Sequence, residues 1–269
     1  MQRIDLTETE KEPVTNHTSK GNQPKWHIDG LWYKADHMGY EALAEFVVSE
    51  LLKKTDIVDF VRYELVSIRF DNQEKPGCVS ENFRNKDEML IPVEKLHRQL
   101  FGKGLSAAIA EQDDVTDKIK YTVDFIERVT GIKNFGAYLS AMLALDAFFL
   151  NEDRHTNNIA VIRNEKTLQF RPAPVFDNGL SLMSDINDYP LNTDIYENIK
   201  KVSAKPFAAD FDEQLDAAEK LYGTQLKFSF TKADVREILK KLQEFYDAEI
   251  IKRVEDVIFE QMRKYSAYF

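Results

Sequence analysis

The residues best suited to chemistry lie in one polar segment, NEDRHTNN at 151–158, which directly follows a nearly apolar stretch. A polar loop released by a buried helix is held rigidly and faces solvent, as a reaction site requires. Asp153 and Asn158 in this segment, with Asp177 further along the chain, offer carboxylate and amide oxygens, the ligands that Mg²⁺ prefers. One of the two aspartates can instead act as a general base.

The order of these residues along the chain matches the parts that phosphoryl transfer needs. In that reaction a loop Asp orients the attacking hydroxyl, while a later Asn and a second Asp bind metal. A lysine paired with a helix glutamate holds the phosphates. The loop here is Asp153-x4-Asn158, Asp177 lies in FDNG, and Lys34 in WYKAD is the candidate lysine.

The helix expected after Lys34 offers two glutamate partners. Apolar residues recur every three or four positions between residues 39 and 54, which predicts an amphipathic helix. Glu41 and Glu45 both fall on the border of its apolar face, so either can reach toward the surface on which the helix packs. A G-x-G-x-x-G loop is missing from the sequence, which has only SKGNQ before the first expected strand.

The remaining pattern predicts the elements that position these groups. Residues 25–35 predict a hairpin that turns at Asp29-Gly30, and β-branched and aromatic runs over 57–83 predict an antiparallel meander. Two short strands are expected at 159–163 and 168–176. Helices are expected at 93–102, 117–132, 134–150, 232–247 and 248–265. The helix at 134–150 is nearly apolar all round, so we expect it at the centre of a second, larger unit.

The composition excludes several classes of protein. The 269 residues carry 36 Lys and Arg against 46 Asp and Glu, a net charge of −10. This excess of acid argues against direct nucleic-acid binding and against an anionic membrane surface. A single cysteine, Cys78, excludes an internal disulfide and a cysteine-rich zinc site. Without a signal peptide or membrane-spanning stretch, the sequence predicts a cytoplasmic protein, with secretion as an effector left open.

Taken together and in this order, the motifs resemble the HipA-like serine/threonine kinase family. The family shares a D-x-H-x-x-N loop, here Asp153 to Asn158, and a later P-x-[YF]-D element, here Pro174 to Asp177. The resemblance covers roughly residues 17 to 190. Arg154 within the loop favours the minimal CtkA-like branch, with a more remote similarity to phosphatidylinositol kinases through DRHxxN.

The resemblance implies a fold and an activity. The fold would be α+β and bilobal, protein-kinase-like: a flexible tail at 1–16, a small antiparallel-sheet N-lobe at 17–83, and a larger, mainly helical C-lobe at 84–269. ATP would bind between the lobes. The activity would be Mg²⁺-dependent transfer of the γ-phosphate of ATP to a serine or threonine of a protein substrate, with autophosphorylation and an antitoxin-like protein partner as further expectations.

The resemblance also assigns roles to single residues. Asp153 would be the catalytic base, Asn158 and Asp177 the magnesium ligands, and Lys34 the phosphate-binding lysine, with Glu41 preferred over Glu45 as its partner. His155 is expected to brace the loop. KGNQPK resembles the family's phosphate loop. The remaining assignments are Gly21, Asn22 and Gln23 as phosphate contacts, Thr18 and Ser19 as autophosphorylation sites, and the backbones of Glu81 and Phe83 as adenine contacts.

Three other functions stay open at this stage. A lipid or small-molecule kinase also fits DRHxxN, but it would need a basic membrane-facing surface that this acidic chain does not suggest. A non-catalytic nucleotide-binding pseudokinase is favoured only by the incomplete Gly-rich loop. A metal-dependent nuclease built on residues 151–158 ranks last, because the sequence lacks a basic run for nucleic acid.

Overall fold

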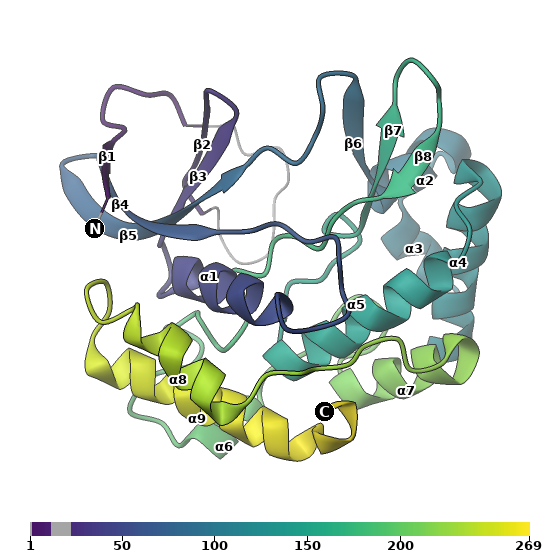
Figure 1. The fold of residues 1–269 in the computed structure, drawn as a ribbon. Helices are drawn as coiled ribbons and strands as arrows, with labels where there is room; N and C mark the ends of the chain where they lie inside the picture. The colour runs from purple at the N-terminus through teal and green to yellow at the C-terminus, as the bar shows by residue number, and fades with distance from the viewer. Residues whose placement is uncertain (1, 12–22) are drawn as a thin grey trace. The chain divides into compact units, whose positions relative to one another are not determined.

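The computed structural model describes residues 2–11 and 23–269. Contacts within the chain divide it into two compact units, each assembled from separated segments (Figure 1). Unit 1 contains Met1–Asn82, Asp177–Val202 and Phe228–Phe269. Unit 2 contains Phe83–Phe176 and Ser203–Lys227. The chain passes from unit 2 into unit 1 at the peptide bond between Phe176 and Asp177.

Unit 1 is built on a five-stranded sheet in the order β1-β4-β5-β3-β2. The strands are β1 (Arg3–Asp5), β2 (Lys25–Ile28), β3 (Leu31–Ala35), β4 (Glu64–Phe70) and β5 (Gln73–Glu81). All neighbours are antiparallel except β1, which is parallel to β4. The predicted turn at Asp29-Gly30 is confirmed, and both residues have the positive φ that a tight hairpin requires.

The helices of unit 1 are α1 (Glu41–Leu52), α6 (Ile195–Ile199), α8 (Lys232–Lys240), α9 (Ala248–Lys264) and the short 3₁₀ helix η1 (Ser266–Tyr268). The predicted helix α1 packs on β3, β4 and β5, and α8 contacts both α1 and α9. The chain enters α1 through Gly39, which pairs with Asp185. A Cβ atom at Gly39 would lie 2.0 Å from the carbonyl oxygen of Ser184, so the close approach requires glycine.

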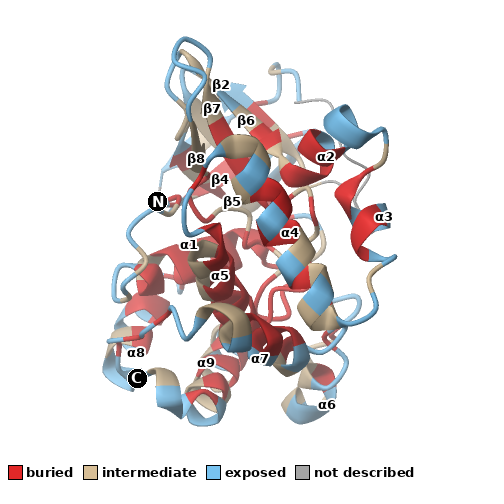
Figure 2. Cartoon of the chain, turned by 90° about the vertical axis from the view of Figure 1, so that its right-hand side faces the viewer, coloured by how far each residue is buried: buried red, intermediate tan, exposed pale blue. Residues whose placement is uncertain are grey.

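Unit 2 combines a three-stranded antiparallel sheet with five helices. The sheet order is β6-β7-β8, formed by β6 (Glu88–Pro92), β7 (Ala160–Asn164) and β8 (Phe170–Pro172). The helices are α2 (Val93–Phe101), α3 (Leu105–Ile109), α4 (Val115–Thr130), α5 (Phe135–Phe149) and α7 (Phe211–Tyr222). Helix α5 contacts α4 and α7, and Figure 2 shows it almost wholly buried, as its apolar sequence predicts.

The structure differs from the sequence-based prediction at several elements. Residues 3–5, assigned to a flexible tail, form β1, because their pairing with β4 is a long-range contact that no local pattern reveals. The strand expected from residue 57 begins only at Glu64, and Val58 is almost fully exposed. The helix expected over 232–247 ends at Lys240. Elements β6, α3, α6 and α7 were not predicted.

No helix in the described part of the chain combines the length and the apolar composition that crossing a bilayer requires.

The central position of α5 generates a stability prediction. Leu143 is fully buried in the core of unit 2, so replacing it with alanine should leave a cavity and cost about 3 kcal/mol of unfolding free energy. Leu100→Ala is the matched control, because this leucine is half exposed on α2 and its loss should cost less than about 1 kcal/mol. Urea denaturation of both variants checks the difference, and equal costs would contradict the assignment of α5 to the core.

Candidate active site

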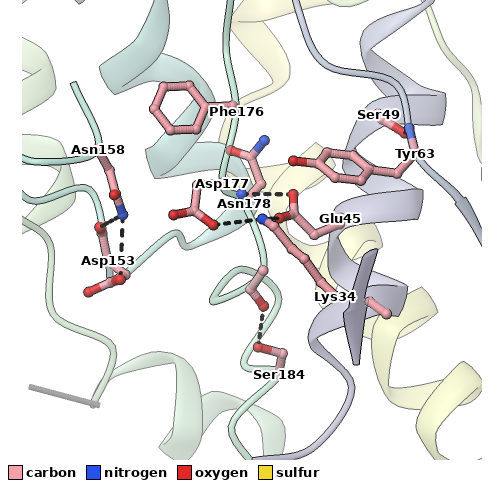
Figure 3. Close-up of polar contacts among 12 residues, drawn as sticks. Lys34, Glu45, Ser49, Tyr63, Asp153, Asn158, Phe176, Asp177, Asn178 and Ser184 are labelled. Carbon is pink, nitrogen blue, oxygen red and sulfur yellow. Dashed lines mark hydrogen bonds and ion pairs between the residues drawn. The ribbon is translucent and has the colours of Figure 1, made fainter. Parts of the chain in front are cut away.

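Lys34 on β3 is the centre of a buried charged cluster in unit 1. Its ammonium group forms an ion pair with the carboxylate of Glu45 on α1 and a second one, at 2.8 Å, with Oδ1 of Asp177 (Figure 3). Glu45 is 0% exposed and also accepts a hydrogen bond of 2.9 Å from the backbone N–H of Asn178. Glu45 therefore joins the sheet to the FDNG turn.

The electrostatics of this cluster keep Lys34 protonated. Burial by itself disfavours the ammonium, but the carboxylates of Asp177 and Glu45 outweigh burial and hold the pKa of Lys34 well above its usual value. The ring of Tyr63 lies 5.3 Å from the Lys34 nitrogen and adds a cation–π contact. The lysine is thus a fixed positive charge.

The sequence-based preference for Glu41 as the partner of Lys34 is wrong. The Glu41 carboxylate instead accepts hydrogen bonds from the backbone N–H groups of three residues that precede α1: His37, Met38 and Gly39. Glu41 therefore shapes the entry into the helix, where a negative charge is favourable. Residues four apart lie on the same helix face, so spacing alone could not separate Glu41 from Glu45.

Asp177, in the FDNG turn, has an uncommon backbone conformation. Its φ is 59°, in the left-handed region, which aspartate tolerates better than most residues. The turn is closed further along by Ser184, whose hydroxyl donates a 2.6 Å hydrogen bond to the carbonyl oxygen of Gly179. Because this positive φ lies outside a hairpin turn, it marks Asp177 as a candidate for a functional role.

In unit 2, the loop at 151–158 is organised by Arg154, which sequence reasoning did not assign to the site. This side chain is 0% exposed. It forms an ion pair with Asp146 at 2.9 Å and donates hydrogen bonds to the carbonyl oxygens of Asn158 (3.2 Å) and Phe176 (2.9 Å). The available signal was Asp146 itself, the one charged residue in the otherwise apolar α5.

Asp153 and Asn158, the predicted loop pair, lie together (Figure 3). The amide nitrogen of Asn158 donates to the Asp153 carbonyl oxygen at 2.8 Å and lies 3.5 Å from its Oδ2. The nitrogen of the Asn158 amide is engaged in these contacts, and its oxygen is the atom that a hard cation would bind. Lys205 places its ammonium 3.4 Å from Oδ1 of Asp153, a contact that the sequence did not indicate.

His155 does not brace the loop through its side chain. Its backbone does so, by donating to the Asp153 carbonyl at 2.7 Å and accepting from the Asn158 N–H at 2.8 Å. Both ring nitrogens are buried and make no hydrogen bond with the described residues. The ring Nε2 lies 3.8 Å from Oδ2 of Asp153.

The predicted nucleotide contacts are only partly within the described residues. Gly21, Asn22, Thr18 and Ser19 lie outside them, whereas Gln23 is half-buried just before β2. Glu81 ends β5 opposite Leu31. The Phe83 ring lies 5.7 Å from the Phe176 ring, beside the small cluster formed by Ala160, Ile162 and Ala173. Their roles toward ATP stay predictions.

Metal binding must be argued from oxygen donors. Within residues 2–11 and 23–269 there is no group of three or more His, Cys, Asp or Glu side chains that could hold a metal ion. Taken singly, the amide oxygen of Asn158 and the carboxylate of Asp177 are the kinds of donor that Mg²⁺ takes.

Comparisons with known proteins support the fold. No family model and no curated protein matches the chain. The Helicobacter pylori proinflammatory kinase CtkA matches with a TM-score of 0.64 and 17% identity, over 97% of this chain and 94% of that one. HipA of the Shewanella oneidensis MR-1 toxin–antitoxin system, solved with HipB and operator DNA, matches with a TM-score of 0.54 and 13% identity, over 96% of this chain and 67% of that one.

These similarities confirm the α+β, protein-kinase-like fold class and the predicted resemblance to HipA-like kinases. At such low identity they concern the fold and not the reaction.

The Arg154–Asp146 pair generates a stability prediction. Arg154→Met should cost about 3 to 5 kcal/mol, because it leaves the Asp146 carboxylate buried without its cation. The double variant Arg154→Met, Asp146→Leu should recover part of the loss, but not the part due to the two carbonyl oxygens that Arg154 binds. Denaturant unfolding of the single and double variants measures this, and additive losses would contradict a coupled pair.

The Lys34 cluster generates a prediction about reactivity. In Glu45→Gln, one of the two compensating carboxylates is gone, so burial lowers the pKa of Lys34 and its neutral, nucleophilic form appears at lower pH. Glu41→Gln is the matched control and should leave Lys34 unchanged. Competitive acetylation of Lys34 from about pH 8 to 11, followed by peptide mass spectrometry, checks this. If Lys34 is acetylated with the same pH dependence in both variants, the pairing of Lys34 with Glu45 is refuted.

Proposed function

We propose that the chain is an ATP-dependent serine/threonine protein kinase of the HipA-like type. The observation that carries the proposal is the Lys34 ammonium held between Glu45 and Asp177, on a fold shared with the kinase CtkA. In protein kinases a strand lysine paired with a helix glutamate positions the phosphates of ATP. Asp153 and Asn158, five residues apart on a rigid loop, supply the second part of that machinery.

In the proposed reaction each charged group has one task. Lys34 binds the phosphates of ATP, and the Glu45 carboxylate keeps its ammonium charged and in place. Asp153 accepts the proton of the attacking hydroxyl, since it is the loop carboxylate that lies beside Asn158. Lys205, 3.4 Å from Asp153, adds positive charge where the transferred group carries negative charge.

Asn158 and Asp177 would each supply an oxygen ligand to Mg²⁺. When bound, the ion neutralises charge on the phosphates. In the structure the Asp177 carboxylate forms an ion pair with Lys34, which orients it.

The remaining expectations belong to the same proposal. The acceptor is a protein, because a net charge of −10 does not favour a membrane or nucleic acid. Autophosphorylation at Thr18 or Ser19 would act on the predicted phosphate loop. An antitoxin-like protein partner is proposed by analogy with HipA, whose solved structure contains HipB.

The proposal predicts that a substitution of the base impairs phosphate transfer but not ATP binding. Asp153→Asn removes the base and should lower phosphate transfer by a factor of about 10² to 10⁴, while leaving ATP affinity within about threefold. Asp113→Asn, at an exposed position before α4, is the control and should keep full activity. Intact mass after incubation with Mg-ATP and calorimetric ATP binding measure the two properties. Transfer retained by Asp153→Asn would sink the assignment of the base, and no transfer by the unmodified chain to any protein would favour a pseudokinase.

A further inference from the structure

A cavity of about 280 Å³ lies within unit 2, next to the proposed base. Its wall includes Lys205 and His155. Both also approach the Asp153 carboxylate, at 3.4 and 3.8 Å respectively. The cavity and the base are therefore connected through these two side chains. A group in the cavity that contacts Lys205 or His155 is separated from the proposed base by one side chain.

Two ammonium groups lie in the wall, and Lys205 is the one that pairs with Asp153. Besides Lys205, the cavity is lined by Lys118 of α4. The Lys118 ammonium donates a 3.4 Å hydrogen bond to the carbonyl oxygen of Phe207 and forms no ion pair with another described residue. Its charge is thus not neutralised by a carboxylate of the described chain.

The carboxylate of Glu94 lies behind the wall and is held by hydrogen bonds from residues that line the cavity. Ser106 and Thr156 line the cavity, and both donate to the buried carboxylate of Glu94. Arg98 forms an ion pair with the same carboxylate at 3.0 Å. The hydrogen bonds and the arginine compensate the charge of Glu94, and Lys205 is paired with Asp153, so the Lys118 ammonium determines the sign of the cavity.

His155 supplies a polar ring whose nearest charged neighbour is Oδ2 of Asp153, 3.8 Å from Nε2 and beyond hydrogen-bond distance. Both of its ring nitrogens are buried and have no hydrogen-bond partner among the described residues. Buried polar atoms are nearly always satisfied in folded proteins, and an exception calls for a ligand or water. The ring lines the cavity, so an occupant with oxygen atoms could satisfy it.

We infer that this cavity is the acceptor subsite of the proposed kinase, and that it selects a serine or threonine flanked by an acidic side chain. The inference rests on the proposed function. The hydroxyl oxygen forms the new bond to the γ-phosphorus, the bond from that phosphorus to the β–γ bridging oxygen breaks, and the hydroxyl proton passes to Asp153. The flanking carboxylate binds Lys118 and the ring of His155.

This inference differs from what the net charge suggests. A chain at −10 would by itself attract basic or neutral partners. Charges more than about 8 to 10 Å away are screened at physiological salt, whereas groups in direct contact are not. The local Lys118 ammonium therefore decides acceptor selection.

The test compares two serine peptides that differ only in their flanking residues, glutamate in one and lysine in the other. The wild-type chain should phosphorylate the acidic peptide about five- to tenfold faster, as one partly exposed charge pair allows. Lys118→Glu should reverse the ratio. The control is Lys120→Glu, on the same helix but rotated about 200° away, where the lysine pairs with Asp124 and should leave the ratio unchanged.

Release of ADP from ATP is measured in the same samples. ADP release without a preference for the acidic peptide overturns the inference alone, as does a ratio that Lys118→Glu leaves unchanged. No ADP release and no peptide transfer overturns the proposed function and the inference with it. If Lys118→Glu melts early, Lys118→Gln takes its place and should bring the ratio close to one, and a ratio still at the wild-type value overturns the inference.

Discussion

A lysine ammonium buried in unit 1 can exist only with carboxylate partners, and much of the local architecture follows from that requirement. An unpaired charge in a low-dielectric interior would lose its proton or unfold the structure around it. Lys34 meets the requirement through Glu45 and Asp177, which come from a helix and from a turn more than a hundred residues later. Helix α1 must therefore pack with Glu45 inward, and the close approach at Gly39 allows the chain to enter it there.

Unit 2 also contains a buried cation that needs a carboxylate partner, here an arginine. The fully buried Arg154 is paired with Asp146, and its remaining donors hold the carbonyl oxygens of Asn158 and Phe176. Phe176 is thus anchored in unit 2, while the next residue, Asp177, is anchored in unit 1 by Lys34. A hydrogen bond from Arg154 thus holds Phe176, and the ion pair with Lys34 holds Asp177.

Local pattern predicted the elements that carry the candidate site, and it missed a strand that depends on a distant contact. The apolar run of α5 and the amphipathic period of α1 are properties of short windows, and both helices formed as expected. The pairing of β1 with β4 is non-local and left no trace in the sequence of residues 3–5. The helix α7 was missed although its signals were present: Asp210 caps its start and Gly223 ends it.

The site was predictable to the level of residue type and order, but not of partner choice. The sequence indicated Lys34, Asp153, Asn158 and Asp177. It could not separate Glu45 from Glu41, because both share one helix face and only the packing of α1 brings one of them to Lys34. The contact between Lys205 and Asp153 could not be predicted for a different reason. Lys205 lies 52 residues from Asp153, in a segment without a motif.

The central claim is that these charges serve transfer of the terminal phosphoryl group of ATP to a protein hydroxyl. The most direct test incubates the chain and a mixture of candidate protein acceptors with Mg²⁺ and ATP labelled at either the γ- or the α-phosphorus, followed by phosphoamino-acid analysis. The account predicts label on serine or threonine from γ-labelled ATP alone. Label transferred from the α position, or no label on protein from either nucleotide, would contradict it.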